Sequence, residues 1–281
     1  MAEDKRTKIP TALCVSPTHL IRVDTARGRL RYYEHPFTEV TVNRNGVDMK
    51  EKEQYPSVTS ILGEAVNKPF LTYWRDGRTR STLKAHLGEV LTEQIINDAM
   101  NSSRKEGANG AELGSILHDA IDGYLKGDES AMDVPDQLMP AAMAFMDWRS
   151  KNSDWKYLES ETAVFYKGEL KYAGTIDALF EDRKGNLIIV DWKTSSEVYQ
   201  ENLLQLAAYS RALRKMTEQP VIAQVVLFKN KRDKTIDERP KIFLEEFPTV
   251  KTVVESQWMK AFEGACHLYD ASNIDIEKDV A

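Results

Sequence analysis

The spacing of apolar residues changes along the chain, from a helical period to an alternating one near residue 155. In AELGSILHDAIDGYL, residues 111–125, apolar side chains recur every three or four positions, which predicts an amphipathic helix. A polar loop with Pro135 separates it from a second expected helix at 136–151. The next three segments are rich in β-branched and aromatic residues and predict successive strands: WKYLESETAVFY, KYAGTIDALFE and NLIIVDWKT.

The pattern then returns to a helix at 197–215 and a strand in QVVLFKN. The order from residue 110 to 229 is therefore helix, strand, strand, strand, helix, strand, which predicts an α/β core with a mixed sheet. Beyond it, KIFLEEF predicts another strand, and 248–269 predicts a final helix.

The N-terminal part of the chain has a different pattern. Residues 1–55 are strand-rich and irregular, and FTEVTVNRNGVDM predicts a hairpin with Asn45-Gly46 as its turn. YPSVTSILGEAV opens a helical stretch, for which Ser57 or Thr59 is the expected N-cap. Most of 69–125 should be helical. We therefore divide the chain into an N-terminal region, 1–108, and a core, 109–281.

Composition limits the class of protein. The 281 residues carry a net charge of −6 with a pI near 5.5, which argues against coating nucleic acid by bulk charge but leaves room for a local basic groove. With two cysteines, Cys14 and Cys266, neither a disulfide framework nor a four-cysteine zinc or iron–sulfur site is expected. The sequence shows no secretory signal and no membrane-spanning apolar run, so we expect a cytoplasmic protein.

Two aspartates and a lysine stand where the strands of GTIDALFEDRKGNLIIVDWKTS should be buried. The midpoint of Asp177 and Asp191 falls in the expected turn, so an antiparallel hairpin places the two carboxylates opposite or diagonal to each other. Lys193 follows Asp191 by two positions and shares its face. Alternation puts Ile176 on the opposite face, with Ala178 and the other core residues.

Adjacent carboxylates repel each other, and a divalent cation removes that repulsion. Oxygen ligands suit Mg²⁺ or Mn²⁺, and a neighbouring lysine can orient a water molecule, which is the chemistry of metal-assisted phosphodiester hydrolysis. The alternative is an Asp–Lys ion pair on a sheet face, with the second aspartate solvated.

GTID followed by DWK resembles the Asp…(Asp/Glu)-x-Lys signature of the PD-(D/E)xK nuclease superfamily, and the order of elements matches that superfamily's core. The resemblance implies that Asp177, Asp191 and the backbone carbonyl of Trp192 bind one or two Mg²⁺ or Mn²⁺ ions, and that Lys193 positions the attacking water. The proline of the signature is replaced here by Ile176.

Two further matches resemble the RecB-like branch, which includes phage-encoded exonucleases and the mitochondrial genome maintenance exonuclease. QLAAY places Gln205 and Tyr209 one helical turn apart, as in a motif that contacts DNA and supports the lysine. GSILH places His118 as an additional metal-site residue. Taken singly, each match fits ordinary packing. The resemblance covers about 55–229, and its order and spacing carry the inference.

Further candidate DNA contacts lie around these motifs. A predicted helix near LTYWRDGRTR interleaves aromatic and basic residues, as single-strand binding requires, although a solvated charged helix has the same pattern. Glu161, or Glu159 on the same face, could add a third carboxylate. Ser57 and Thr59 could contact phosphate or simply cap a helix. The complete set of expected DNA contacts is Ser57, Thr59, Trp74, Arg75, Arg78, Arg80, Thr194, Ser195, Gln205 and Tyr209.

The resemblance therefore implies a metal-dependent exonuclease that hydrolyses single-stranded DNA from free ends, in phage-type replication, recombination or repair. Region 1–108 would gate the substrate. No iron–sulfur cluster, nucleotide cofactor or membrane association is expected, whereas a single-strand-annealing or replication partner would fit such a role. Two alternatives stay open: a recombination exonuclease that resects one strand of a duplex, and a DNA-end-binding module without catalysis. Polarity and oligomeric state are not written in these motifs.

Overall fold

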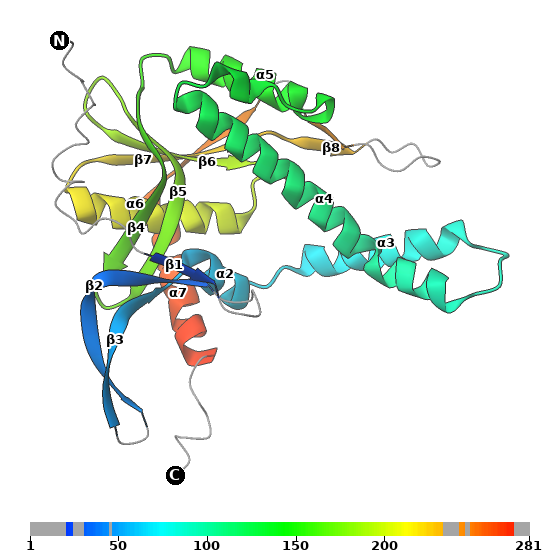
Figure 1. The fold of residues 1–281 in the computed structure, drawn as a ribbon, viewed down its shortest axis with the longest axis horizontal. Coiled ribbons are helices and arrows are strands. Elements are labelled where there is room, and N and C mark those ends of the chain that lie inside the picture. The colour runs from blue at the N-terminus through cyan, green and yellow to red at the C-terminus, as the bar shows by residue number, and fades with distance from the viewer. Residues whose placement is uncertain (1–20, 25–30, 45–46, 233–241, 245–247, 273–281) are drawn as a thin grey trace.

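The computed structural model describes residues 21–24, 31–44, 47–232, 242–244 and 248–272 (Figure 1). Within these ranges the centre of the fold is a five-stranded sheet in the order β10-β7-β6-β5-β4. Strands β6 and β7 pair in parallel and the other neighbours are antiparallel, which confirms the predicted mixed sheet. Its strands are β4 (Lys156–Lys167), β5 (Lys171–Glu181), β6 (Leu187–Lys193), β7 (Val221–Leu227) and β10 (Thr249–Val253).

The β5–β6 hairpin has the expected register. Its ladder runs from Glu181↔Leu187 to Ala178↔Val190, so the next step places Asp177 opposite Asp191. The turn is tight because Asp182 accepts backbone hydrogen bonds from Lys184 and Asn186. The sequence therefore predicted the register of this hairpin correctly.

Helices cover both faces of the sheet (Figure 1). On one face α6 (Gln200–Thr217) and α7 (Glu255–Ser272) pack against a cluster that includes Leu179 and Ile189. On the other, α4 (Glu93–Leu125) and α5 (Met139–Lys151) pack against a cluster that includes Trp192.

The prediction for Ile176 was wrong. Ile176 packs with Leu179 in the α6/α7 cluster, whereas Ala178 joins the α4/α5 cluster. Strict alternation therefore fails across Asp177. The partner strand is irregular at the same level, where Glu161 has a left-handed φ of 51° between the pairs Ser160↔Ala178 and Thr162↔Ile176.

The C-terminal helix also begins later than expected, because TVKTVV, residues 249–254, is β-branched. This segment contributes β10, and α7 starts only at Glu255. Of the KIFLEEF strand, the structure describes β9 (Ile242–Leu244), which pairs with β8 (Asn230–Arg232). Two short 3₁₀ helices, Glu129–Met132 and Asp136–Leu138, connect α4 to α5.

The N-terminal strands β1 (Ile21–Asp24), β2 (Arg31–Arg44) and β3 (Val47–Pro56) form a separate sheet. Strands β2 and β3 pair up to Arg44↔Val47, although the predicted turn residues themselves lie outside the described ranges. This sheet is fixed to β4 and β5. A bridge joins Ser57 to Ala173, and the buried carboxylate of Glu53 pairs with Lys167 of β4 and Lys171 of β5 at 2.9 and 3.0 Å.

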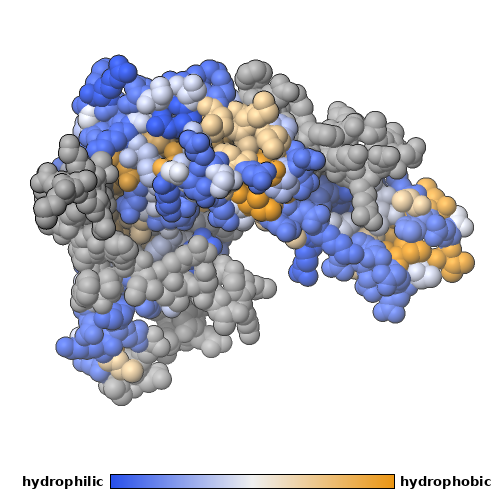
Figure 2. All heavy atoms as spheres, turned by 45° about the horizontal axis from the view of Figure 1, so that its top comes forward, coloured by the Kyte–Doolittle hydropathy of each residue, from blue (hydrophilic) through white to orange (hydrophobic). Residues whose placement is uncertain are grey.

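Helix α2 (Val58–Ala65) leads into α3 (Pro69–Ala85), which pairs with the first half of α4 as a helical arm projecting from the body (Figure 1). Helix α4 is much longer than the predicted segment and runs without interruption past residue 108, so the division at 108/109 stays a prediction. The end of the arm carries an apolar patch (Figure 2), to which Leu87, Val90 and Leu91 belong.

Candidate active site

The ends of β5 and β6 bring three of the predicted residues together. The Nζ atom of Lys193 lies 2.7 Å from Oδ2 of Asp191, which is only 2% exposed. The backbone N–H of Trp192 donates to Oδ2 of Asp177 at 2.9 Å. The hairpin thus positions one carboxylate by an ion pair and the other by a main-chain hydrogen bond.

Burial dominates the electrostatics of this pair. It raises the pKa of Asp191 to about 6, and the nearby charge of Asp177 acts in the same direction, although Lys193 opposes both. Burial lowers the pKa of Lys193, but the charges of Asp191 and Asp177 outweigh it, so the net pKa lies above its ordinary value. Lys193 is therefore held as an ammonium, and a cation near Asp191 would be favourable.

His118 reaches this point from α4, on the other side of the backbone of β6. Its Nε2 atom lies 3.0 Å from the carbonyl oxygen of Trp192, and its Nδ1 atom lies 3.7 Å from Oδ2 of Asp177. Gly114, one turn earlier, lets α4 approach, because a Cβ there would stand 3.0 Å from Oγ1 of Thr194. Four predicted site residues and the Trp192 carbonyl therefore meet at one place.

This donor set fits a hard divalent cation. Carboxylate and carbonyl oxygens suit Mg²⁺ or Mn²⁺, and an imidazole can join them. In this structure the His118 ring and the Trp192 carbonyl are joined by a hydrogen bond of 3.0 Å, which would open if both bound an ion. Across the described part of the chain, no three His, Cys, Asp or Glu side chains converge as a ready-made metal cage. Mg²⁺ usually completes its coordination with water molecules.

The Gln-Tyr pair of α6 lies beneath the same strands. The Nε2 atom of Gln205 donates to the Tyr209 hydroxyl at 2.9 Å, and burial raises the pKa of Tyr209, so the phenol stays protonated. Gly174 of β5 makes room for this ring, since a Cβ there would overlap it. The motif thus supports the strand that carries Asp177.

The sequence reasoning missed Tyr33. From the N-terminal sheet, its hydroxyl lies 2.9 Å from Oγ1 of Thr175, two residues before Asp177. A single tyrosine in an N-terminal strand gives no signal of this role, because the contact spans 142 positions along the chain.

A model of the PD-(D/E)XK nuclease superfamily matches residues 105–274. The chain belongs to this superfamily. Its members are nucleases that typically use divalent metal ions, and the superfamily implies a DNA substrate. The matched residues include His118, both aspartates and Lys193, and they begin within α4.

Two solved structures show a distant likeness to this nuclease. The crystal structure of SSO0001 is 18% identical, with a TM-score of 0.32 over 71% of this chain and 88% of that one. A candidate exonuclease from Eubacterium rectale is 12% identical, with a TM-score of 0.36 over 71% of this chain and 82% of that one. The comparison with curated proteins gives no match. No helix within the described ranges of the nuclease is long and apolar enough to cross a membrane.

The residues expected to contact DNA differ in accessibility. Ser57 is fully buried, and its Oγ atom accepts from the N–H of Ser60 as the N-cap of α2, which favours the capping alternative. Thr59 is exposed, and Thr194 and Ser195 are half-buried beside the site. Ser195 donates to the carbonyl of Glu197 at 2.7 Å.

The basic residues of α3 also differ in their surroundings. Arg78 pairs with Glu106 of α4 at 2.6 Å, which ties the two helices of the arm together. Arg75 and Arg80 are exposed, and Trp74 is half-buried between the helices. Glu161 lies on β4 at the level of Asp177 and is exposed, so it remains a candidate for a third carboxylate.

Proposed function

We propose that this nuclease is a divalent-metal-dependent DNA exonuclease of the RecB-like type, which hydrolyses single-stranded DNA from free ends. The observation that carries the proposal is the meeting of Asp177, Asp191 and Lys193 with His118 around the Trp192 carbonyl. A role in phage-type replication, recombination or repair follows from the resemblance of the motifs.

The residues divide the reaction among them. Asp177, Asp191, His118 and the Trp192 carbonyl would hold Mg²⁺ or Mn²⁺, which when bound supplies Lewis acidity to the scissile phosphate. Lys193, kept as an ammonium, donates hydrogen bonds to the attacking water and to a phosphate oxygen, where negative charge develops.

Gln205 and Tyr209 act from below the strands. Their hydrogen bond uses one N–H of the amide and leaves the phenolic proton available. We propose that Tyr209, which is only 2% exposed, positions the strand of Asp177, and that the half-buried Gln205 contacts the DNA. Thr194 and Ser195, beside the site, and the exposed Thr59 of α2 are the expected phosphate contacts.

Hydrolysis of an end-labelled linear strand tests the proposal. The strand is incubated with Mg²⁺, with Mn²⁺ and with EDTA, beside a circular single strand and an open duplex. Loss of the linear strand in the metal lanes, with the circle intact, is the expected result, and the label that disappears first gives the polarity.

The same lanes separate the alternatives. Degradation of one strand of the open duplex, with slow loss of the free strand, would point to a recombination exonuclease. Tight binding without a product in any lane would point to an end-binding module. Cutting of the circle would overturn end dependence.

A further inference from the structure

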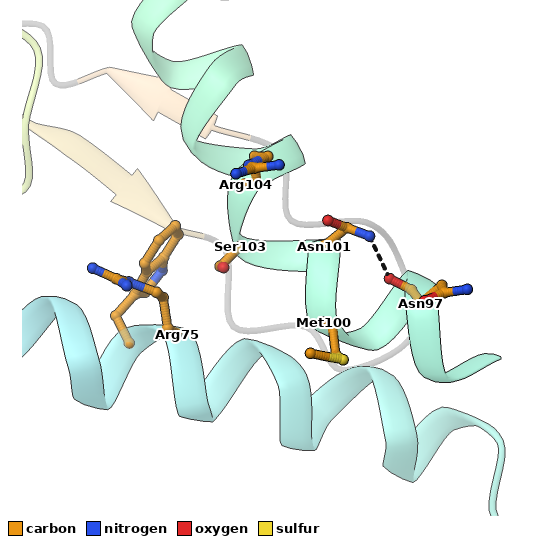
Figure 3. A pocket seen from close by; sticks show the side chains of 7 residues that line it. Arg75, Asn97, Met100, Asn101, Ser103 and Arg104 are labelled. Carbon is orange, nitrogen blue, oxygen red and sulfur yellow. Dashed lines mark hydrogen bonds between the residues drawn. The ribbon is translucent and has the colours of Figure 1, made fainter. Parts of the chain in front are cut away.

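The arm contains a pocket of about 450 Å³ between α3 and α4, away from the catalytic residues. Figure 3 shows Arg75 rising from α3 and Arg104 lying on α4, with the thioether of Met100 directed toward α3. The volume is within the range of small-ligand sites, roughly 300–1,000 Å³. The complete lining is Trp74, Arg75, Asn97, Met100, Asn101, Ser103 and Arg104.

The side chains that line the pocket combine positive charge with flat, polarizable surface. They include two guanidinium groups and no carboxylate, in a chain whose net charge is −6. Within the described ranges, neither Arg75 nor Arg104 forms an ion pair with an acidic side chain, unlike Arg78 next to them, which pairs with Glu106. An indole and a thioether add flat, polarizable surface, and three amide or hydroxyl side chains add hydrogen-bonding groups. Such a site suits a ligand with a phosphate and a planar ring.

We propose that this pocket binds one unstacked nucleotide of the single strand, several nucleotides away from the bond that is cleaved. The phosphate lies between Arg75 and Arg104, and the base rests on Trp74 and Met100, as in other single-strand sites that combine charge with stacking. The inference rests on the proposed single-stranded substrate and adds a second, distinct contact to it.

Helix α4 connects the pocket to the active site. Arg104 precedes His118 by 14 residues, which at 1.5 Å per residue is about 21 Å along the helix. Since 14 residues make nearly four turns, both side chains lie close to the same face. Between them this face carries small residues, which are exposed except for the half-buried Gly114: Gly107, Ala108, Ala111, Gly114 and Ser115. A strand can therefore follow α4 from the pocket to His118.

The distance predicts a length threshold. At the stacked spacing of 3.4 Å per nucleotide, about 21 Å corresponds to roughly six nucleotides, and fewer when the strand is extended. A strand shorter than this reaches the active site or the pocket but not both, and it can still bind at the active site when Arg104 is replaced. Longer strands, which occupy both places, should therefore depend on Arg104 most.

Binding is measured by fluorescence anisotropy in EDTA, with labelled oligonucleotides of 3, 6, 10 and 20 nucleotides. Because no metal is needed, the result is independent of whether the chain cleaves DNA. Arg104→Gln is compared with Lys105→Gln, which removes the same charge from the next residue of the same helix, where the lysine pairs with Asp98 at 2.9 Å.

We expect Arg104→Gln to weaken binding of the 20-mer about tenfold and to reduce its salt dependence by about 0.7 in logarithmic slope. Lys105→Gln and the 3-mer should show little change. Trp74→Phe should remove the quenching of tryptophan fluorescence by the 20-mer. Any one of three results would overturn the proposal. Arg104→Gln and Lys105→Gln could weaken binding equally, the effect of Arg104→Gln could be the same at every oligonucleotide length, or the 20-mer could still quench tryptophan fluorescence in Trp74→Phe.

Discussion

The two ends of helix α4 lie in very different surroundings. Near its C-terminal end, Leu117 and Ile121 are fully buried, and His118 touches the backbone of the central sheet. Near its N-terminal end, Ile96 and Met100 are exposed, and α3 packs along the helix. The helix thus joins a tightly packed catalytic centre to an open arm. A side chain in the centre is held by several partners, whereas a side chain on the arm is available to a ligand.

The largest effect should come from the centre. Asp191→Asn keeps the shape of the side chain but removes the charge that would hold a cation, and Lys193→Met removes the ammonium. Each should lower the rate of DNA cleavage by about 10³-fold or more, with a circular dichroism spectrum like that of the unchanged chain. Cleavage by Lys193→Met at a near wild-type rate would show that the lysine has been assigned the wrong role.

Two glycines, one in the packed centre and one on the arm, should differ in how their replacement by alanine changes the free energy of unfolding. A Cβ at Gly174 would overlap the Tyr209 ring, so Gly174→Ala should lower the free energy of unfolding by about 1–3 kcal/mol. A Cβ at Gly110, in the exposed half of α4, would meet no atom within 4 Å, so Gly110→Ala is the matched control. It should raise the free energy of unfolding by about 0.5–1 kcal/mol, because alanine favours a helix. Urea denaturation measures both, and similar effects would contradict the contrast.

The same contrast explains what could be predicted from the sequence. An antiparallel hairpin relates residues symmetrically about its turn, so the turn position alone was enough to predict the register that ends at Ala178↔Val190, one step before the two aspartates. His118 followed from resemblance, since periodicity alone gives only a helix face. Tyr33 and the Gly174–Tyr209 contact were missed because packing between distant segments leaves no local pattern.

In the arm, the sequence predicted the local structure but not the packing of the two helices. Its helical character was evident, but the way in which α3 crosses α4 was not, so Arg104 and Asn101 were not recognised as neighbours of Trp74 and Arg75. The error at Ile176 also concerns a non-local feature, since the backbone irregularity at this level, the left-handed φ of Glu161, lies on the partner strand β4.

Acid should act on the attachment of the N-terminal sheet. Burial would raise the pKa of Glu53, but hydrogen bonds from Lys167 and Lys171 outweigh it and lower the pKa to about 2. A depressed pKa stabilises the fold above the ordinary glutamate value and loses this contribution as the pH falls toward 2. Glu53→Gln should therefore cost about 1–3 kcal/mol at neutral pH and flatten the decline of stability between about pH 4.5 and 2. Thermal unfolding of the variant and the unchanged chain across this pH range measures the decline of stability. If the decline is the same in both, other carboxylates cause it.

The smallest effect should come from the end of the arm. Leu87 is 79% exposed, so replacing it with serine removes little buried apolar surface and should change the free energy of unfolding by less than about 0.5 kcal/mol. Leu206 of α6, which is fully buried, is the matched position in the core, and Leu206→Ser should cost at least about 2 kcal/mol. If Leu87→Ser lowered the free energy of unfolding as much as Leu206→Ser, the apolar end of the arm would have to be covered in solution. The open arm that single-strand binding requires would then not exist in the free protein. Sedimentation of the two variants beside the unchanged chain would then identify whether a second copy provides that cover.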